Sequence, residues 1–524
     1  MSQATLSLPA PDAAPAVNKW AVAVAVALGA LLEIVDTSIV NVALTDLQTT
    51  LGATLSEVSW VVSGYAVANV IVLPLTAWLG DRFGKKTYFI FSLIGFTFAS
   101  VLCGMATSLT MLVIARILQG LMGGGLLAKA QAILFETFPR EEQAMAQAFF
   151  GVIVISGPAI GPTLGGYLVT NVGWRWIFFV NVPIGIFAVM MCIAALPTDS
   201  VKKLTSRVDW WSLLLLAVGL GSLQTLLEEG NSEDWFESRL IVALFVSAIV
   251  ALVLFVRRQM KTDIPVVDLR VLRYRTLWAG SILSVILGMA LYGALFAVPI
   301  FAQLIMGYTS QETGLLLLPS ALASAVTMIV AGKLLRTLDP RIGLLFGSCT
   351  LIFAVYSLSS LSAQTGVDDL FWPLIIRAVG TVCMFLPLNM ATLGPIPKKD
   401  ISAATGFFNL TRQLGGSVGV ALLTLLLTHR QAFHRSVLVE KLTLSDPNML
   451  ERLNQLTAAF VAKGAVLNEA RMRALAVLDA TVNREAAVMS FSDTFWATAV
   501  LIMVFLPLIA LLDKPAKGVQ VEAH

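Results

Sequence analysis

Long apolar runs with almost no charged residues recur along the 524-residue chain, and they constrain its fold more than any other feature. A run of more than about 18 apolar residues is typical of a helix that crosses a bilayer. The composition agrees, since 57% of the residues are hydrophobic and only 13% are charged, whereas soluble domains contain about 25% charged residues. We therefore predict an all-α integral membrane protein, with the lipid bilayer as its surroundings.

The runs predict fourteen transmembrane helices, and the loop charges predict their orientation. If the N-terminus lies inside, the inner loops contain most of the loop lysines and arginines, whereas the short outer loops contain only Arg175 and Arg239. Since positively charged loops remain in the cytoplasm, both termini are predicted to be cytoplasmic. The expected spans are 20–43, 58–79, 87–107, 109–130, 145–169, 175–196, 210–228, 239–256, 277–302, 313–335, 342–362, 370–393, 403–427 and 491–512.

The chain also resembles itself at an offset of about 260 residues. LTMLVIAR, which ends at Arg116, matches LFWPLIIR, which ends at Arg377. Two further pairs of segments, around Gly29 and Gly288 and ending at Gly161 and Gly419, occur in the same order at nearly the same offset. Two related halves are typical of transporters whose substrate site lies between them near the bilayer midplane. We predict two pseudo-symmetric six-helix bundles, 19–196 and 276–512, separated by two inserted helices and a cytoplasmic linker, 197–275. The other expected segments are a disordered tail at 1–18, an outer loop of amphipathic helices at 428–490 and a second tail at 513–524.

The first run contains two acids, Glu33 and Asp36, which are the only acids that we expect to be buried in the bilayer. Their spacing places them on one helical face together with Asn41. Burial and mutual repulsion both penalise charged carboxylates, so each must face a cavity or a partner. We interpret the two acids as proton- or cation-binding groups, and a structural pair that holds the first helix is the alternative.

Arg116 in the fourth run is the expected partner of Asp36. Both residues lie about 10 Å from an outer helix end, at 1.5 Å per residue. An arginine stabilises the charged form of a nearby carboxylate, and protonation of the acid releases the arginine. The pair can therefore be a switch or a fixed ion pair, which Gln119 would extend. Lys129, at the inner end of the same run, is expected to reach the membrane surface.

Cations and amides inside the second half of the chain suggest a cavity. Arg377 and Arg412 have no acid in their own runs. We expect them to bind asparagines or helix ends, or to face a cavity that receives an anionic substrate. The candidate cavity residues are Asn41, Gln119, Tyr292, Phe296, Arg377, Asn389, Asn409 and Arg412.

Two glycine-containing segments are candidates for moving parts. The first, LGDRFGKK, follows the second run and contains Asp81, Arg82, Gly84 and Lys85, of which Gly84 permits a tight turn. In the second, SGPAIGPTLGG, glycines four residues apart allow close helix packing and prolines bend the helix. The second segment contains Gly157, Pro158, Gly161, Pro162, Gly165 and Gly166.

Several classes of function are disfavoured by the sequence. It lacks the GxxxxGK(S/T) motif that binds nucleoside triphosphates, and its three histidines have no companions at metal-ligand spacing. We therefore expect no enzymatic activity, no metal and no cofactor, with an ion gradient as the energy source. A net charge of +3 is too small to indicate nucleic acid as a partner.

Taken together, the motifs resemble the fourteen-span drug:proton antiporters of the major facilitator superfamily, the EmrB/QacA type. EIVDTSIVNVAL is similar to the first-span signature, LGDRFGKK to the loop motif, ARILQGLMGGG to the arginine motif, and SGPAIGPTLGG to the antiporter signature. Two positions depart from the family pattern, since Ala77 replaces the first glycine of the loop motif and Thr45 replaces the final proline of the first-span signature. The resemblance implies a major facilitator fold and proton-driven, alternating-access export of amphipathic small molecules, including drugs.

The resemblance also implies roles for individual residues and partners. Asp36 and Arg116 would couple transport to protons, whereas the role of Glu33 depends on its burial alone. Asp81 and Arg82 would belong to a cytoplasmic gate, and the Gly–Pro segment would support the conformational change. A bacterial inner membrane is the implied location, and the long outer loop implies a periplasmic adaptor and an outer-membrane channel as possible partners.

Two other functions fit the same residues. One is a proton symporter that imports an organic anion, with Arg377 and Arg412 as its receptors. The other is a membrane receptor or scaffold without transport activity, which would use the outer loop as its interaction surface.

Overall fold

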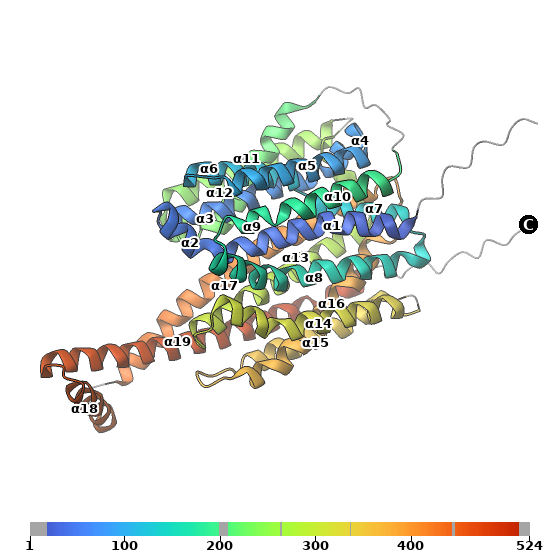
Figure 1. Ribbon diagram of the computed structural model, residues 1–524. Coiled ribbons are helices and arrows are strands. Elements are labelled where there is room, and N and C mark those ends of the chain that lie inside the picture. The colour runs from blue at the N-terminus through green and yellow to red at the C-terminus, as the bar shows by residue number, and fades with distance from the viewer. Residues whose placement is uncertain (1–17, 199–207, 263–264, 336, 443–445, 513–524) are drawn as a thin grey trace, which may run out of the picture.

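Helices form all the regular structure in the described part of this computed structural model, which contains no strand. They lie roughly side by side along one direction (Figure 1). Thirteen are long and apolar enough to cross a membrane, and the apolar stretch Arg275–Ala290 begins one more helix. The predicted all-α membrane architecture is therefore confirmed. The described residues are 18–198, 208–262, 265–335, 337–442 and 446–512, so the predicted tails lie outside them except for Asn18.

The first bundle contains the helices up to residue 195, several of which share a span. Short 3-10 turns, η1 (Val40–Ala43) and η2 (Leu73–Leu75), continue α1 and α3 into the helices that follow them. The helices are α1 (Lys19–Ile39), α2 (Leu44–Leu51), α3 (Leu55–Val72), α4 (Thr76–Phe83), α5 (Lys85–Gly104), α6 (Leu109–Gly123), α7 (Leu126–Thr137), α8 (Arg140–Asn171), α9 (Trp176–Phe179) and α10 (Asn181–Ala195).

The fourth span consists of two helices, α6 and α7, separated by a glycine break. Gly125 has φ of 73°, a left-handed conformation that glycine adopts without the strain caused by a side chain. A Cβ on Gly124 would lie 2.7 Å from the carbonyl oxygen of Gly120, so this position also requires glycine. The break leaves the first amides of α7 inside the bundle, where they need acceptors from elsewhere in the protein.

The second bundle and the inserted pair follow. Helix α11 packs against α12 and also contacts α3 and α17, which belong to different bundles. The helices are α11 (Trp210–Glu229), α12 (Arg239–Lys261), α13 (Arg275–Leu304), α14 (Ser310–Leu334), α15 (Pro340–Leu358), α16 (Val367–Leu393), α17 (Ile401–Lys441), α18 (Pro447–Ala462) and α19 (Leu467–Phe505), with 3-10 turns η3 (Trp235–Glu237), η4 (Leu269–Arg273) and η5 (Leu506–Leu511).

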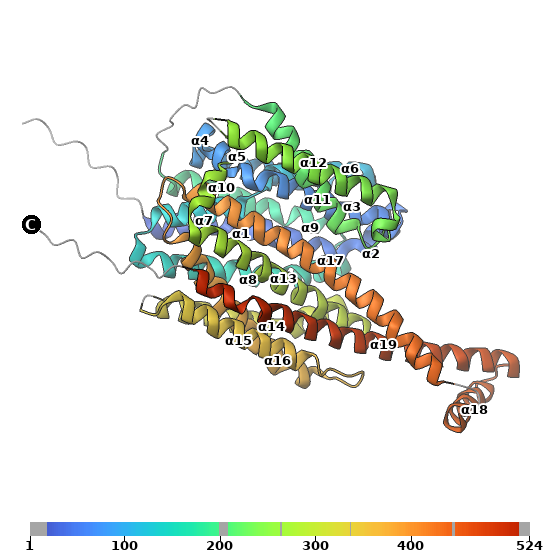
Figure 2. The same cartoon turned by 180° about the vertical axis from the view of Figure 1, so that it is seen from behind.

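The described residues of the long loop expected at 428–490 are mostly helical, as their amphipathic pattern predicts. Helices α17 and α19 extend past the rest of the bundle at one end, and α18 lies beside the tip (Figures 1 and 2). The ion pair of Arg435 with Asp479, 2.8 Å long, joins α17 to α19 in this projection. The three helices therefore form one arm that continues two spans of the second bundle.

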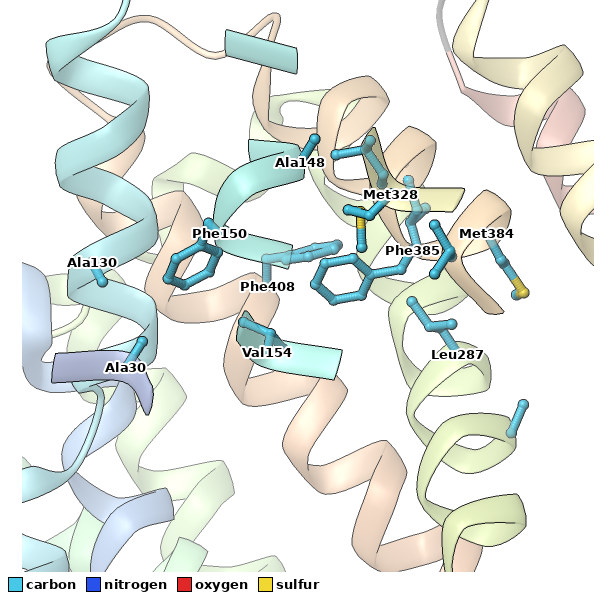
Figure 3. Packing of buried hydrophobic residues seen from close by; sticks show 14 of the residues in the cluster. Ala30, Ala130, Ala148, Phe150, Val154, Leu287, Met328, Met384, Phe385 and Phe408 are labelled. Carbon is cyan, nitrogen blue, oxygen red and sulfur yellow. The ribbon is translucent and has the colours of Figure 1, made fainter. Parts of the chain in front are cut away.

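Apolar side chains of both bundles meet where α8 packs against α14 and α16. Phe150 of α8 lies near Phe408, Phe385 and Met328, which come from the second bundle (Figure 3). None of the four is more than 1% exposed. The hydrophobic core therefore continues across the contact between the bundles.

Candidate functional site

Asp36 lies fully buried in the first bundle and accepts hydrogen bonds from three side chains. Arg116 of α6 donates from Nη1 to Asp36 Oδ2 at 2.5 Å. The other oxygen, Oδ1, accepts from Gln119 Nε2 at 2.9 Å and from Asn181 Nδ2 at 2.7 Å. Since a buried carboxylate needs a counter-charge and donors for its lone pairs, this arrangement holds an ionised Asp36 inside the bundle.

Arg116 is held as fully as its partner. Its Nε donates to the carbonyl oxygen of Val61 at 2.9 Å, and its Nη1 also donates to Gln119 Oε1 at 2.7 Å. The guanidinium lies 4.3 Å from the ring centroid of Tyr65, a distance at which a cation and an aromatic face attract each other. The predicted meeting of Asp36, Arg116 and Gln119 is therefore confirmed, although the sequence did not indicate Asn181.

Glu33 belongs to a separate group. Its Oε1 accepts from Asn69 Nδ2 of α3 at 2.7 Å, and its Oε2 accepts from the backbone amide of Leu127 at 2.7 Å. Leu127 is in the first turn of α7, so Glu33 supplies the acceptor that the glycine break requires. A carboxylate at a helix N-terminus is also stabilised by the helix dipole. The two acids of α1 therefore bind different helices, with no shared partner in their described hydrogen bonds.

Lys129 was expected to extend to the membrane surface, and this prediction is wrong. Its side chain lies inside the first bundle, where Nζ donates to Ser92 Oγ at 2.8 Å and lies 3.8 Å from the ring centroid of Tyr88. Helix α7 continues to Thr137, beyond the end of the predicted span. Lys129 therefore lies well short of the helix end.

The Gly–Pro segment forms the seam between α8 and α1. A Cβ on Gly161 would lie 1.9 Å from Ser38 Oγ, and a Cβ on Gly157 would lie 2.4 Å from Ile34 Cγ2. Gly165 meets Ile39 in the same way, at 2.8 Å. Only glycine permits this approach, which brings α8 against the helix that contains both acids. The helix continues past the other three residues of the segment, which are Pro158, Pro162 and Gly166.

The loop motif covers the end of α4 and the start of α5, which meet at Gly84 with φ of 90°. Asp81 is exposed near the end of α4, and the Arg82 guanidinium lies 5.5 Å from the ring centroid of Trp78. Lys85 forms an ion pair with Glu136 at 2.6 Å. The segment is therefore joined to the last turn of α7 through its lysine.

Glu136 connects the same place to the second bundle. Its carbonyl oxygen accepts from Lys398 Nζ at 2.8 Å, and its Oε1 accepts from Ser402 Oγ at 3.3 Å. Sequence reasoning missed Glu136, which lies in an inner loop pattern with no motif of its own. Lys85, Glu136 and Ser402 hold the two bundles together at the end predicted to be cytoplasmic.

The amides of the candidate cavity form a hydrogen-bonded chain between the bundles. Gln131 of α7 donates from Nε2 to Asn389 Oδ1 at 2.7 Å and accepts at Oε1 from Asn409 Nδ2 at 2.7 Å. Arg412 in turn donates to Asn409 Oδ1. The predicted contact between an arginine and an asparagine of the second half is thus present, and Gln131, which the sequence did not indicate, joins it to the first bundle.

The other cavity candidates are not joined to these groups. Arg377 is buried, and its Nε has no hydrogen-bond partner among the described residues. Asn41 is exposed on η1, and its amide donates to the carbonyl oxygen of Thr37 at 3.5 Å. The side chains of Tyr292 and Phe296 lie outside the described part of the chain.

Burial inside the protein is not confined to Glu33 and Asp36. Glu229, at the end of α11, is 7% exposed and accepts from Ser63 Oγ of α3 at 2.9 Å. Its neighbour Glu228 accepts from Gln224, which also donates to Ser417 of α17 at 2.8 Å. Both acids end an apolar run, and the contacts of α11 with both bundles cover them.

Comparison with known proteins adds independent information on this arrangement. Residues 26–420 match the sequence profile of the Major Facilitator Superfamily. The multidrug export protein EmrB of Escherichia coli strain K12 is 32% identical over 498 residues, which cover 94% of this chain and 95% of EmrB. The fatty acid resistance protein FarB of Neisseria gonorrhoeae is 30% identical over 494 residues, covering 94% of this chain and 96% of FarB. Among solved structures, the proton:xylose symporter XylE superposes with a TM-score of 0.58 at 12% identity, covering 94% of this chain and 99% of XylE, a likeness that concerns the fold alone.

Proposed function

This chain belongs to the Major Facilitator Superfamily, and from that premise we propose that it exports amphipathic compounds, including drugs, in exchange for protons. It is a multi-pass membrane transporter with the predicted major facilitator fold, and it is not an enzyme. Its division into bundles at 19–196 and 276–512, with an inserted segment at 197–275, is part of the proposal.

The buried pair of Asp36 and Arg116 is the observation that carries the proposal. Asp36 is 0% exposed and Arg116 is 1% exposed, so neither charge is solvated by bulk water. When a proton neutralises Asp36, the guanidinium loses its counter-charge and the contact between α1 and α6 weakens. The pair then has two states of different charge, which is the requirement for coupling a proton to a conformational change.

The glycine seam gives this change a route to the contact between the bundles. Helix α8 packs on α1 through Gly157 and Gly161, whereas another face of α8 packs on α14 of the second bundle. A Cβ on Gly314 of α14 would lie 2.2 Å from Thr163 Oγ1 of α8, so the two helices are in close contact there. A shift of α1 against α8 therefore reaches the second bundle through tightly packed helices.

The relatives guide the choice of substrate, location and partners. One is named for multidrug export and one for resistance to fatty acids, and both kinds of compound are amphipathic or hydrophobic. We propose a bacterial inner membrane with both termini in the cytoplasm, which places the arm of α17, α18 and α19 on the outside. There the arm can contact a periplasmic adaptor that leads to an outer-membrane channel.

Transport by the purified chain in liposomes tests this function. A lipophilic fluorescent cation and a medium-chain fatty acid serve as probes, with an imposed pH gradient of either direction. Antiport predicts that each transported probe moves against the proton flow and that Asp36→Asn abolishes this dependence. Asp46→Asn makes the same chemical change on the exposed face of α2 and is expected to have no effect.

The possible outcomes separate the candidate functions. Movement of a probe in the same direction as protons would overturn antiport and support the importing symporter. Absence of any gradient-dependent movement of either probe would support a receptor or scaffold. Unchanged coupling in Asp36→Asn would contradict the role of the buried pair.

A further inference from the structure

Helix α7 of the first bundle is hydrogen-bonded to the second bundle through two of its residues. Gln131 binds Asn389 and Asn409, and Glu136 binds Lys398 and Ser402. The N-terminal turn of the same helix binds Glu33, as described above. One short helix therefore contacts an intramembrane acid at one end and the opposite bundle along its length.

The contact of Gln131 is well defined because every amide in it has a fixed orientation. Arg412 can only donate, so Asn409 must present its oxygen to the guanidinium and its Nδ2 to Gln131. Gln131 must then present its Nε2 to Asn389, whose own Nδ2 donates to the carbonyl oxygen of Phe385 at 2.8 Å. All donors point the same way along the chain of bonds, which is anchored by the Arg412 cation.

Burial among apolar side chains strengthens these hydrogen bonds and raises the free-energy cost of breaking them. Gln131 is 1% exposed, and Asn389 and Asn409 are 0% and 2% exposed. Phe385 and Phe408 lie in the apolar contact between the bundles (Figure 3). Phe385 supplies the carbonyl oxygen that binds Asn389, and Phe408 directly precedes Asn409 in the chain. Hydrogen bonds in such a setting are stronger than in water, and an amide left without a partner there is strongly disfavoured. Separation of the bundles would let water solvate the asparagines.

Glu33 is placed to control the position of Gln131. Leu127, which donates to Glu33, and Gln131 are four residues apart, so they lie one turn apart on the same face of α7. The charged groups that act on Glu33 are Lys129 on α7 and Arg412 on α17, and Asn69 and Tyr65 of α3 lie beside it. Neutralisation of Glu33 removes the charge that holds the N-terminus of α7.

We propose that Gln131 is a latch between the two bundles, and that Glu33 positions this latch through the first turn of α7. With Glu33 charged, α7 is held and the latch is closed. A proton on Glu33 weakens the hold on α7, breaks the bonds from Gln131 to Asn389 and Asn409, and favours opening of the side predicted to be cytoplasmic. This role rests on the proposed alternating-access function, and it makes Gln131 a positioning residue rather than a substrate contact.

The test measures the distance between the bundles directly. Spin labels at positions 141 and 399, which are exposed on α8 and beside α17, report opening in a chain whose four cysteines are replaced. Gln131→Leu removes two bonds between the bundles, each worth about fivefold in an equilibrium, so the closed-to-open ratio should fall about 25-fold. Glu33→Gln, which mimics the protonated acid, should shift the distances in the same direction.

Gln143→Leu provides a matched control. Gln143 is also a buried glutamine, but its amide donates to the carbonyl oxygens of Phe135 and Phe138 within the first bundle. It should leave the distance distribution unchanged even if it lowers stability. An equal shift in Gln143→Leu would overturn the latch, because it would show that any loss of a buried amide opens the bundles.

The double variant tests whether Glu33 acts through Gln131. If it does, Glu33→Gln adds no further opening in a chain that already contains Gln131→Leu. Full additivity would refute the link, and an unchanged distance in Gln131→Leu would refute the latch itself. These measurements use no substrate and no gradient, so their outcome is independent of whether the transport assay supports proton-coupled export.

Discussion

A double-mutant cycle on the buried ion pair gives the sharpest prediction. Asp36→Asn keeps the oxygen that accepts from Gln119 and Asn181, but it places an amide donor where Arg116 Nη1 lies 2.5 Å away. The guanidinium is then buried with no counter-charge. Removal of one partner from a buried pair costs about 3–5 kcal/mol. Arg116→Met should cost less, since the remaining acid can bind a proton whereas an arginine cannot lose one.

The double variant should be more stable than the sum of the two changes implies. With both charges removed, the remaining cost is that of unpaired amide groups, about 1–3 kcal/mol. Coupling of about 3 kcal/mol or more between the two positions is therefore expected. Transport is expected to behave differently, because none of the three variants retains both the carboxylate that can bind a proton and the guanidinium that pairs with its charged form.

Unfolding in mixed detergent micelles measures the stabilities, and proteoliposomes measure proton-coupled transport. Glu142→Gln is the control, since its ion pair with Lys19 is 2.7 Å long but both side chains are 39% exposed. An exposed pair contributes about 0–1 kcal/mol, so this variant should resemble the parent. Stabilities that simply add in the double variant would refute the energetic role of the pair, and retained coupling in that variant would refute its functional role.

Three further predictions concern the backbone, the seam and pH. Gly125→Ala should destabilise the protein by about 1–2 kcal/mol in a thermal melt, because its φ of 73° is left-handed. Gly161→Leu should abolish probe transport in liposomes, because even a Cβ would lie 1.9 Å from Ser38 Oγ. The Arg258 guanidinium lowers the pKa of the Asp209 carboxyl from 3.8 to about 2, so this pair stabilises the folded state above pH 4 and its contribution disappears as the pH falls toward 2. Asp209→Asn should therefore lower the melting temperature at pH 6 and have progressively less effect below pH 4, and an effect that grows on acidification would contradict the assignment.

The architecture and the principal pair could be predicted from the sequence because each depends on a local pattern. Apolar runs identify spans wherever the lipid requires them. Asp36 and Arg116 could be matched because both lie at the same depth in neighbouring spans and few charges compete for either. The glycine segment was equally clear, since glycines four residues apart must lie on one face of a helix.

The residues that sequence reasoning missed depend on packing between distant segments. Asn181 is a single amide in an apolar run, and only the approach of α10 to α1 gives it a role. Glu229 ends a run and resembles a loop acid until α11 is placed against α3. Gln131 lies beyond the predicted end of its span at residue 130, because hydropathy does not indicate that a second helix, α7, follows the glycine break and continues to Thr137.

Because of that break, the two acids of α1 bind two different helices. Asp36 holds α6, through Arg116, and Glu33 holds α7, through Leu127, so one helix fixes both halves of the fourth span. If that span were a single rigid helix, neutralisation of either acid would move Arg116 and Gln131 together. Because Gly125 separates the halves, α6 can respond to Asp36 while α7 responds to Glu33. Two acids three residues apart can therefore govern different steps. Asp36 would act on the ion pair inside the first bundle, and Glu33 would act on the contact between the bundles.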